Sequence, residues 1–432
     1  MSLPARPEIG KEQYFSKTKG IGGKLRGKPE DFIVEEIINL NQKKHWIWSK
    51  ENDQGKHSIV KITAKNWDTH VLVKELAKRL NIGQKAISFA GTKDKRAVTK
   101  QHFSLMAKQK DIEKINLKNI NIEFCHRTIK PIRLGNLIGN KFTVKITDAK
   151  ENITNAEKII DELKDGFPNY FGIQRFGAVR PITHLIGEKI IEGNYEGAVW
   201  KYLCDGNEKF AGFEARNKLK KTRDLKTALE EYPRSMLFER QMIGYLLRKK
   251  DDYIGALKQL PENLSKMFVH AYQSSIFNQT IDMRLRMGEK LHVPLIGDNV
   301  IPIDNYGGPD QRRVIEVTEY NQKKLEKRCN EGKAWVVGLL PGLESKHTKG
   351  LQGDLEKKIM NDEKIRFKDY QINEIPNFTS LGMYRPLCQK INDLEWEIDG
   401  KGDIILNFWL HKGTYATSFL REIMKSKDVR AY

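Results

Sequence analysis

The sequence predicts an α+β protein in which a largely helical stretch interrupts a β-rich one. Runs rich in β-branched residues, such as 31–36 and 58–64, are typical of strands. From about residue 181 the apolar periodicity is that of helices. Strand patterns return at 394–399 and 403–410, which are joined by a glycine-bearing turn and predict a hairpin.

This order of elements indicates that one domain is inserted into another. We therefore expect a discontinuous domain formed by residues 1–180 and 377–432, with an insertion at 181–376. We find no internal repeat and no low-complexity linker.

Local signals justify each expected element in turn. The stretch 69–83 predicts a helix that Thr69 can cap, because Leu72, Leu76 and Leu80 share one face and a glycine follows. The apolar run 87–90 predicts a short buried strand, and further strands are expected at 102–107, 121–130 and 141–147. Further helices are expected in a capping-box segment with Thr154 and Glu157 and at 183–203, 235–250, 264–287, 319–332 and 414–425.

Charge is the clearest signal in the composition. The 432 residues carry a formal net charge of +20, and a polyanion is the natural partner of so basic a chain. A lysine-rich surface is also common in proteins from thermophilic sources, which is the alternative explanation. Four scattered cysteines without a C-x-x-C pair, no apolar run of 18 residues and no signal-like start lead us to expect a cytoplasmic protein without a membrane span.

One carboxylate stands among cations in the stretch 89–101, "FAGTKDKRAVTKQ". Lys93 precedes Asp94, and Lys95 and Arg96 follow it. Neighbouring positive charges favour the ionised form of a carboxylate, which suits a nucleophile or an electrostatic stabiliser better than a general acid. A solvated charged turn is the plainer interpretation of the same pattern. No G-x-x-x-x-G-K-[ST] motif is present, and His411 lacks the partner spacing of a metal site.

A family resemblance adds to this pattern. The stretch 89–101 resembles the signature of the TruD family of tRNA pseudouridine synthases. Six other stretches resemble that family in the same order along the chain: "RGKPEDFIVEE" at 26–36, "KNWDTH" at 65–70, "LGNLIGNKFTV" at 134–144, "PNYFGIQRFG" at 168–177, "SSIFNQ" at 274–279 and "FWLHKGTYATSFLRE" at 408–422.

The resemblance implies a fold and an activity. It implies a pseudouridine-synthase core with a mixed, mainly antiparallel sheet, interrupted by a largely helical TruD insertion domain. It also implies isomerisation of uridine to pseudouridine in tRNA, typically at uridine 13, without a cofactor or a metal. The target uridine would have to leave its base stack before a protein group could reach it.

The resemblance also implies roles for individual residues. Asp94 matches the catalytic aspartate, which would attack the sugar or the base, or take a proton as a glycal forms. Phe142 matches an aromatic residue that would stack on the extruded base, and Asn140 matches a polar residue of the same pocket. Arg26 would pair with Asp94 or hold a phosphate, and Phe32 would form a pocket wall or part of the core.

The remaining basic residues of these motifs are candidates for contact with RNA. Lys93, Lys95 and Arg96 could bind phosphate. Arg175, in the stretch 168–177, could also contact the RNA. A non-catalytic basic RNA-binding or chaperone protein is the alternative function. An RNA methyltransferase is a third, which the absence of a G-x-G-x-x-G after a strand disfavours.

Overall fold

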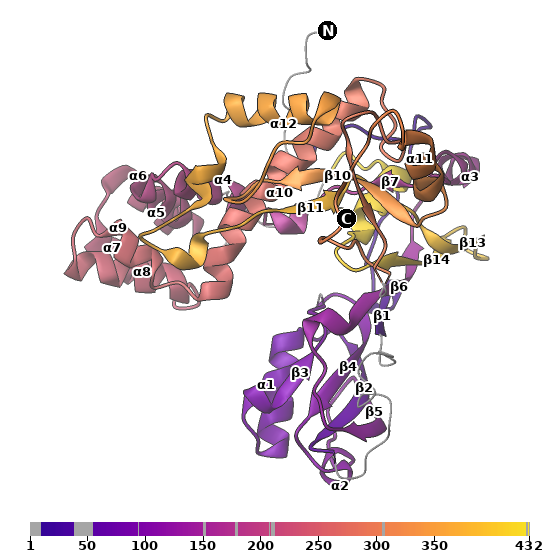
Figure 1. The fold of residues 1–432 in the computed structure, drawn as a ribbon. Coiled ribbons are helices and arrows are strands. Elements are labelled where there is room, and N and C mark those ends of the chain that lie inside the picture. The colour runs from indigo at the N-terminus through magenta and orange to yellow at the C-terminus, as the bar shows by residue number, and fades with distance from the viewer. Residues whose placement is uncertain are drawn as a thin grey trace. The chain divides into compact units, whose positions relative to one another are not determined.

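The computed structural model describes residues 10–38, 55–93, 95–149, 153–177, 180–206, 208, 212–304, 307–428 and 431 (Figure 1). By its internal contacts the chain divides into two compact units. Unit 1 comprises residues 1–15, 168–302 and 309–388, and unit 2 comprises residues 16–167, 303–308 and 389–432.

Unit 2 is built on a single large sheet with helices. Its described elements are 3₁₀ turns at Pro29–Asp31, Gln84–Ala86 and Leu134–Asn136, helices α1 Thr69–Leu80, α2 Gln109–Ile112, α3 Ile153–Glu162 and α13 Ala416–Met424, and strands β1 Phe32–Ile38, β2 His57–Lys65, β3 Ile87–Phe89, β4 Val98–Leu105, β5 Ile120–Thr128, β6 Leu137–Ile146, β13 Asn392–Ile398 and β14 Ile404–His411.

The strands of this sheet lie in the order β13-β14-β6-β1-β4-β2-β5, and β3 pairs with β4. Within the described part of the chain, β1 and β4 pair in parallel and the other neighbours are antiparallel. β14 and β13 come from the end of the chain, yet β14 pairs with β6 from the first third. This arrangement confirms the predicted α+β class with a mixed, mainly antiparallel sheet.

One face of the sheet is covered at both ends by helices. Leu72 and Leu76 of α1 are buried against Val60 and Phe103 of strands β2 and β4. At the other end, Phe419 of α13 packs edge-on against a phenylalanine of β14, with 4.9 Å between ring centroids. Burial of these apolar side chains fixes the strand register, because a slip by one residue would turn every side chain to the opposite face.

Unit 1 is mostly helical. Its described elements are the 3₁₀ turns Ile173–Arg175, Phe367–Tyr370 and Pro376–Phe378, helices α4 Thr183–Ile191, α5 Tyr195–Cys204, α6 Phe213–Thr222, α7 Leu225–Glu231, α8 Leu237–Arg248, α9 Tyr253–Leu257, α10 Glu262–Arg286, α11 Gln322–Asn330 and α12 Gly350–Asp362, and strands β8 Asn299–Pro302, β9 Ile315–Glu316, β10 Ala334–Leu340 and β11 Met383–Pro386. The short strands β7 Phe167–Pro168 and β12 Cys388–Gln389 span the chain borders between the units.

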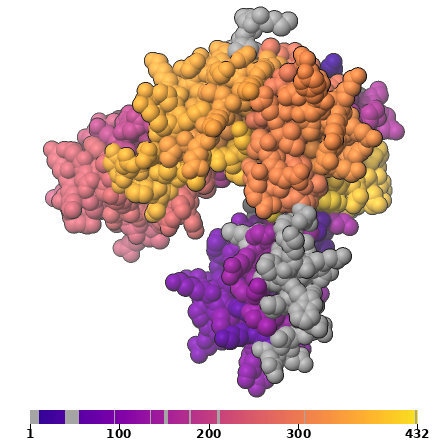
Figure 2. All heavy atoms as spheres, in the orientation of Figure 1, coloured from indigo at the N-terminus to yellow at the C-terminus, as the bar shows by residue number. Residues whose placement is uncertain are grey.

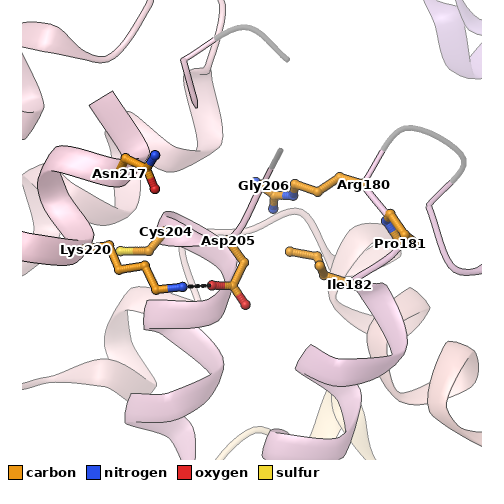
Figure 3. A pocket seen from close by; sticks show the side chains of 8 residues that line it. All are labelled: Arg180, Pro181, Ile182, Cys204, Asp205, Gly206, Asn217 and Lys220. Carbon is orange, nitrogen blue, oxygen red and sulfur yellow. Dashed lines mark hydrogen bonds and ion pairs between the residues drawn. The ribbon is translucent and has the colours of Figure 1, made fainter. Parts of the chain in front are cut away.

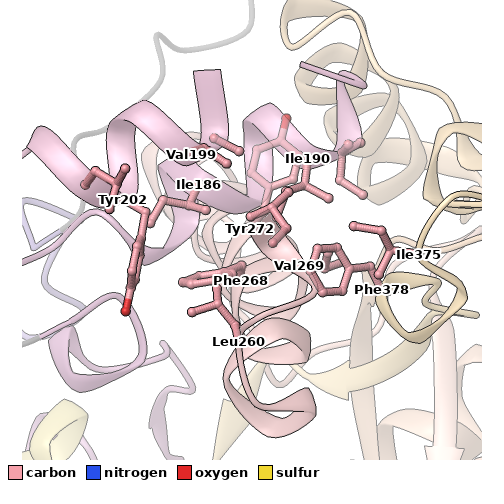
Figure 4. Close-up of a cluster of buried hydrophobic side chains, with 14 of the residues drawn as sticks. Ile186, Ile190, Val199, Tyr202, Leu260, Phe268, Val269, Tyr272, Ile375 and Phe378 are labelled. Atoms are coloured by element: carbon pink, nitrogen blue, oxygen red, sulfur yellow. The ribbon is translucent and has the colours of Figure 1, made fainter. Parts of the chain in front are cut away.

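The long helix α10 organises the core of unit 1. Figure 4 shows its residues Phe268, Val269 and Tyr272 among apolar side chains of α4, α5 and the segment before β11. The four strands of unit 1 pair in the order β11-β10-β8-β9, and every residue of β10 is buried. A helix buried on nearly all sides is typical of the centre of a larger domain.

The structure corrects three local predictions. Asp68, not Thr69, caps helix α1, because the Asp68 side chain accepts hydrogen bonds from the backbone N–H groups of His70 and Val71. Thr154 lies inside α3, which spans Ile153–Glu162. The expected helix at 183–203 is two helices, α4 and α5, and Asn194 caps the second of them.

The compact units have their own borders along the chain. They divide it at 15/16, 167/168 and 388/389, and residues 303–308 join unit 2. The expected borders at 180/181 and 376/377 lie near two of these divisions, and the functional domain assignment stays a prediction. Among the helices that the structure describes, none is both long and apolar enough to cross a membrane.

We predict that the phenylalanine rings packed between β6, β14 and α13 contribute strongly to the stability of unit 2. Phe408 is 1% exposed and contacts Phe142 and Phe419, so Phe408→Ala should lower the free energy of unfolding by about 3–5 kcal/mol through lost burial and a cavity. Denaturant unfolding followed by circular dichroism measures this. Glu397→Ala, on the exposed side of β13, serves as the control and should change the value by at most about 0.5 kcal/mol. Equal effects of the two variants would contradict the packing described here.

Candidate functional site

Polar side chains interrupt the covered face of the sheet in unit 2, midway between α1 and α13. Glu36 continues the inward row of β1 after Phe32 and Val34, and it is 3% exposed. Asn140 of β6 lies directly opposite Glu36 in the antiparallel register. From β4, Gln101 donates a hydrogen bond from Nε2 to Oε1 of Glu36 at 3.3 Å. Three neighbouring strands thus bring three polar groups together on a mainly apolar face.

A buried ion pair joins this polar group to the loop after β3. The Lys93 Nζ lies 2.6 Å from Glu36 Oε1, and the two side chains are 8% and 0% exposed. The second carboxylate oxygen of Glu36 accepts the backbone N–H of His102 at 3.3 Å. A buried charge is stable only when it is paired and hydrogen-bonded, so each of these contacts helps to hold the other ion in place.

Two further contacts fix the same loop. The Thr69 hydroxyl accepts the backbone N–H of Lys93 at 2.9 Å and lies 3.3 Å from the Gln101 Oε1. Gln101 Nε2 also donates to the backbone carbonyl of Gly91 at 2.9 Å. The first turn of α1 and the strand β4 therefore hold residues 91–93 from two sides.

Asp94 itself lies outside the described residues. The residue before it in the sequence, Lys93, is held by the buried ion pair with Glu36. On the other side, Lys95 and Arg96 are exposed. Residue 94 thus follows directly after the fixed part of the loop and precedes two exposed cations.

Aromatic rings lie next to the polar group on the same face. Phe142 stands two residues after Asn140 on β6, and its ring stacks on Phe408 at 5.2 Å between centroids. Phe32 packs edge-on against Phe142 at 6.1 Å. The guanidinium of Arg26 lies 4.4 Å above the Phe32 ring. Four of the residues expected at the site, Arg26, Phe32, Asn140 and Phe142, are therefore brought together in unit 2.

Two features of this group are energetically unusual. Arg26 has a φ of 58°, in the left-handed region that non-glycine residues seldom adopt and that is enriched at functional sites. The Asn140 Oδ1 is buried and has no hydrogen-bond partner among the residues that the structure describes. An unpaired buried acceptor costs about 1–3 kcal/mol, which a ligand donor could recover.

The structure separates the expected phosphate contacts. Lys95 and Arg96 are exposed, whereas the ammonium group of Lys93 is enclosed with Glu36. This enclosure argues against the phosphate contact expected for Lys93, because the ion would have to leave its buried partner. Arg175 belongs to unit 1, where its Nε donates to Ser274 Oγ at 3.1 Å.

Sequence reasoning did not single out Glu36, Gln101 or the loop contact of Thr69. A signal for the first two is present in the strand patterns. Glu36 occupies an inward position of the alternating strand "FIVEEII", and Gln101 does so in "VTKQHFSL". A charged or amide side chain at an inward position of a strand indicates a polar site within the core. The contact of Thr69 depends on the tertiary fold.

Unit 1 contains a separate pocket of about 290 Å³ near the start of α4 and the end of α5 (Figure 3). Arg180 lines it and donates to the Tyr202 carbonyl at 3.0 Å, and burial lowers the pKa of Arg180 to about 10. Asp205 accepts hydrogen bonds from Lys201 and Lys220. The charged groups that line this pocket are therefore already engaged by protein atoms.

Comparison with known proteins gives concordant matches. A family profile described as "tRNA pseudouridine synthase D (TruD)" matches residues 8–423. The chain is 37% identical to a probable tRNA pseudouridine synthase D of Methanosarcina acetivorans, covering 97% of this chain and 96% of the relative. It is 39% identical to a protein of the same description from Picrophilus torridus, covering 97% of each chain.

A solved structure matches in three dimensions as well. The crystal structure of the putative tRNA pseudouridine synthase D (TruD) from Methanosarcina mazei superposes with a TM-score of 0.83 at 36% identity. The match covers 100% of both chains.

The buried ion pair predicts a large effect of neutralising one partner. Glu36→Gln should lower the free energy of unfolding by about 3–5 kcal/mol, because Lys93 would remain buried without a counter-charge. The adjacent Glu35→Gln is the matched control, since Glu35 pairs with the part-exposed Lys61 and Lys100 on the other face and should cost at most about 1 kcal/mol. Denaturant unfolding compares the two. A smaller loss for Glu36→Gln than for Glu35→Gln would contradict the burial.

His102 predicts a pH dependence of stability. Burial lowers the pKa of His102 below its ordinary value of 6.5, although Glu36 opposes this shift. Below pH 6.5 the unfolded chain therefore binds a proton more readily than the folded chain, and stability decreases as the pH falls. His102→Gln should reduce the decrease in melting temperature between pH 7 and pH 5 (about one unfolded-state proton, at most ~1.4 kcal/mol per pH unit). An identical pH profile for the two proteins would refute this.

Proposed function

The chain belongs to the TruD family and is a tRNA pseudouridine synthase, and on that premise we propose that the Asp94 carboxylate isomerises a uridine of folded tRNA. The observation that supports the proposal is the loop 91–93, directly before Asp94 in the sequence, which is fixed by contacts with Glu36, Gln101 and Thr69. We propose uridine 13 as the target, by resemblance to the family.

The chemistry needs no external reagent. Uridine and pseudouridine have the same atoms, so the C1′–N1 bond breaks, the base turns, and a C1′–C5 bond forms. The proton on C5 leaves to solvent while N1 gains one. Because this exchange is redox-neutral, a cofactor or metal is not part of the proposal.

Asp94 has one of two roles in this sequence. An ionised carboxylate can attack C1′ or the base and form a covalent intermediate. Alternatively it takes a proton from the sugar, so that the base departs as a glycal forms. Both roles require the carboxylate to be held within reach of the sugar, because proximity and orientation supply much of the rate enhancement. The ion pair of Lys93 with Glu36 would provide this positioning.

The flipped base needs compensating contacts. Extruding a nucleotide costs a few kcal/mol in lost stacking and pairing. We propose that the buried Oδ1 of Asn140 accepts a donor of the uracil ring, such as N3–H. Phe142 is 7% exposed and already stacks on Phe408, so in the proposal it forms the pocket floor. Phe32 and the guanidinium of Arg26 would form an adjacent wall.

The proposed contacts with the RNA backbone are made by exposed, positively charged side chains. We propose Lys95 and Arg96 as phosphate ligands next to the target nucleotide. Arg175 of unit 1 remains a candidate RNA contact. Lys93 is reassigned to positioning because its ammonium group is enclosed.

The wider setting of the reaction is also proposed. We assign catalysis to residues 1–180 with 377–432 and a substrate-gripping role to the insertion at 181–376. Four free cysteines, three of them buried, are compatible with a reducing cytoplasm, where we place the enzyme.

The alternative is a basic RNA-binding or chaperone protein that keeps the fold without the chemistry. Such a protein would have no use for the carboxylate of Asp94 in the stretch 89–101. One assay tests the role of this residue.

We predict that Asp94→Asn abolishes pseudouridine formation, with at least about a thousandfold loss of rate, because an amide is neither a nucleophile nor a base of comparable strength. Tritium release from tRNA that carries [5-³H]uridine measures the reaction. Asp111→Asn, on the part-exposed helix α2, is the control and should release tritium at the wild-type rate. Equal release by Asp94→Asn would remove this residue from the mechanism, and absence of release by wild type would favour the binding protein.

A further inference from the structure

Positive charge is concentrated in one segment of unit 2. Residues 55–130 contain 17 lysines and arginines against 6 aspartates and glutamates, a net charge of +11, whereas the whole chain carries +20. This segment includes β2 to β5 and helices α1 and α2. A charge density of this kind favours the binding of a polyanion along the whole segment, and not only at the loop that contains Asp94.

One side of α1 presents this charge to solvent. Val71, Lys74, Lys78 and Asn81 follow one another at helical spacing of three or four residues and are all exposed. Val71 is 56% exposed, which is a large fraction for an apolar side chain. In Figure 1, α1 lies along one side of the strands β2 to β5, and violet atoms of the same segment are visible at the surface in Figure 2.

Within the described residues, Lys74 and Lys78 of this stripe (Val71, Lys74, Lys78 and Asn81) have no acidic partner. In the described part of the chain Lys74 and Lys78 make no ion pair, and the adjacent Glu75 is bound to Arg79 at 2.9 Å. Elsewhere this chain pairs helical lysines with acids four residues away, at Lys201–Asp205, Lys266–Glu262 and Lys358–Asp362.

Leaving this stripe unneutralised has a small energetic cost. Like charges four residues apart destabilise a helix by about 0.2–0.5 kcal/mol. Attraction to the helix dipole explains Lys78 in the last turn, but not Lys74 in the middle of α1.

The stripe borders a surface groove. The groove has a volume of about 890 Å³, and its lining includes Val71, Lys74, Lys78, Asn81, Ile82 and Gln84. Its one acidic residue, Glu75, is paired with Arg79. Lysines, amide side chains and exposed apolar carbons are the groups that contact phosphates, sugars and base edges. The next residue, Lys85, is exposed as well and extends the charge past the helix end.

The groove is connected to the catalytic loop through α1 itself. Thr69, the first residue of α1, binds the backbone of Lys93. With a rise of about 1.5 Å per residue, Lys74 and Lys78 lie roughly 8 Å and 14 Å along the helix axis from Thr69. Their separation along the helix axis is about 6 Å, close to one turn of the helix.

From these observations we propose that the exposed side of α1 and the 81–85 turn bind the RNA backbone that flanks the flipped uridine. This inference rests on the proposed function, because it takes the substrate RNA as the occupant. Lys74 and Lys78 bind successive phosphates, and Lys85 lies at the end of the track. Val71 packs against a ribose or a base.

The test compares two charge-matched double variants of the full-length chain. Lys74→Ala with Lys78→Ala should raise the Kd for an unmodified tRNA transcript about 10- to 30-fold at 0.15 M salt, through the loss of two phosphate contacts. The slope of log K against log salt should become shallower by about 1.5. Filter binding over a series of salt concentrations gives both numbers. Lys74→Arg with Lys78→Arg should restore both.

Lys110→Ala with Lys114→Ala is the control. It also removes two positive charges, but from the exposed surface of α2 and the turn that follows it in the same basic segment. This control should change the Kd less than threefold. If the α1 and α2 variants weaken binding equally, or the α1 variant leaves the salt slope unchanged, the proposed surface is wrong. Because binding is measured without turnover, this result is independent of tritium release, whose absence would count against the proposed function alone.

Discussion

The buried ion pair between Glu36 and Lys93 is the interaction on which the rest of the site depends. It lies on the covered face of the sheet and is completed by Gln101, Thr69 and the backbone of His102. A buried pair of this kind adds little net stability compared with apolar residues, but it is costly to break. Its value is therefore positional, since it fixes the main chain directly before Asp94.

The surrounding sheet explains why this pair can exist. α1 closes the apolar face over β2 and β4, and α13 closes it over β14. Between them β4, β1 and β6 carry polar inward residues, and the aromatic series of Phe32, Phe142 and Phe408 borders these residues. The fold thus provides a rigid frame with one polar interruption, and a reactive group placed there is held by packing on both sides.

Much of the fold could be predicted from the sequence because most elements have strong local signals. Alternating strands and the hairpin at 394–410 were foreseen, and so was the long helix around 264–287. The capping residue of α1 was not, since Asp68 and Thr69 are both good caps. The break between α4 and α5 at Gly193 and Asn194 was also missed. The ion pair that fixes the loop 91–93 could not be predicted from the sequence. Glu36 and Lys93 are 57 residues apart and meet only through the parallel pairing of β1 and β4. The phosphate contact expected for Lys93 stays a prediction, which the burial of its ammonium group with Glu36 disfavours.

The most direct test of the account is a crystal structure of the full-length Asp94→Asn protein bound to an unmodified tRNA transcript. The account predicts one uridine out of its stack, with its C1′ beside residue 94, its base against Asn140, and the Glu36–Lys93 pair intact. A structure in which residue 94 faces solvent, with no nucleotide near Asn140, would contradict it.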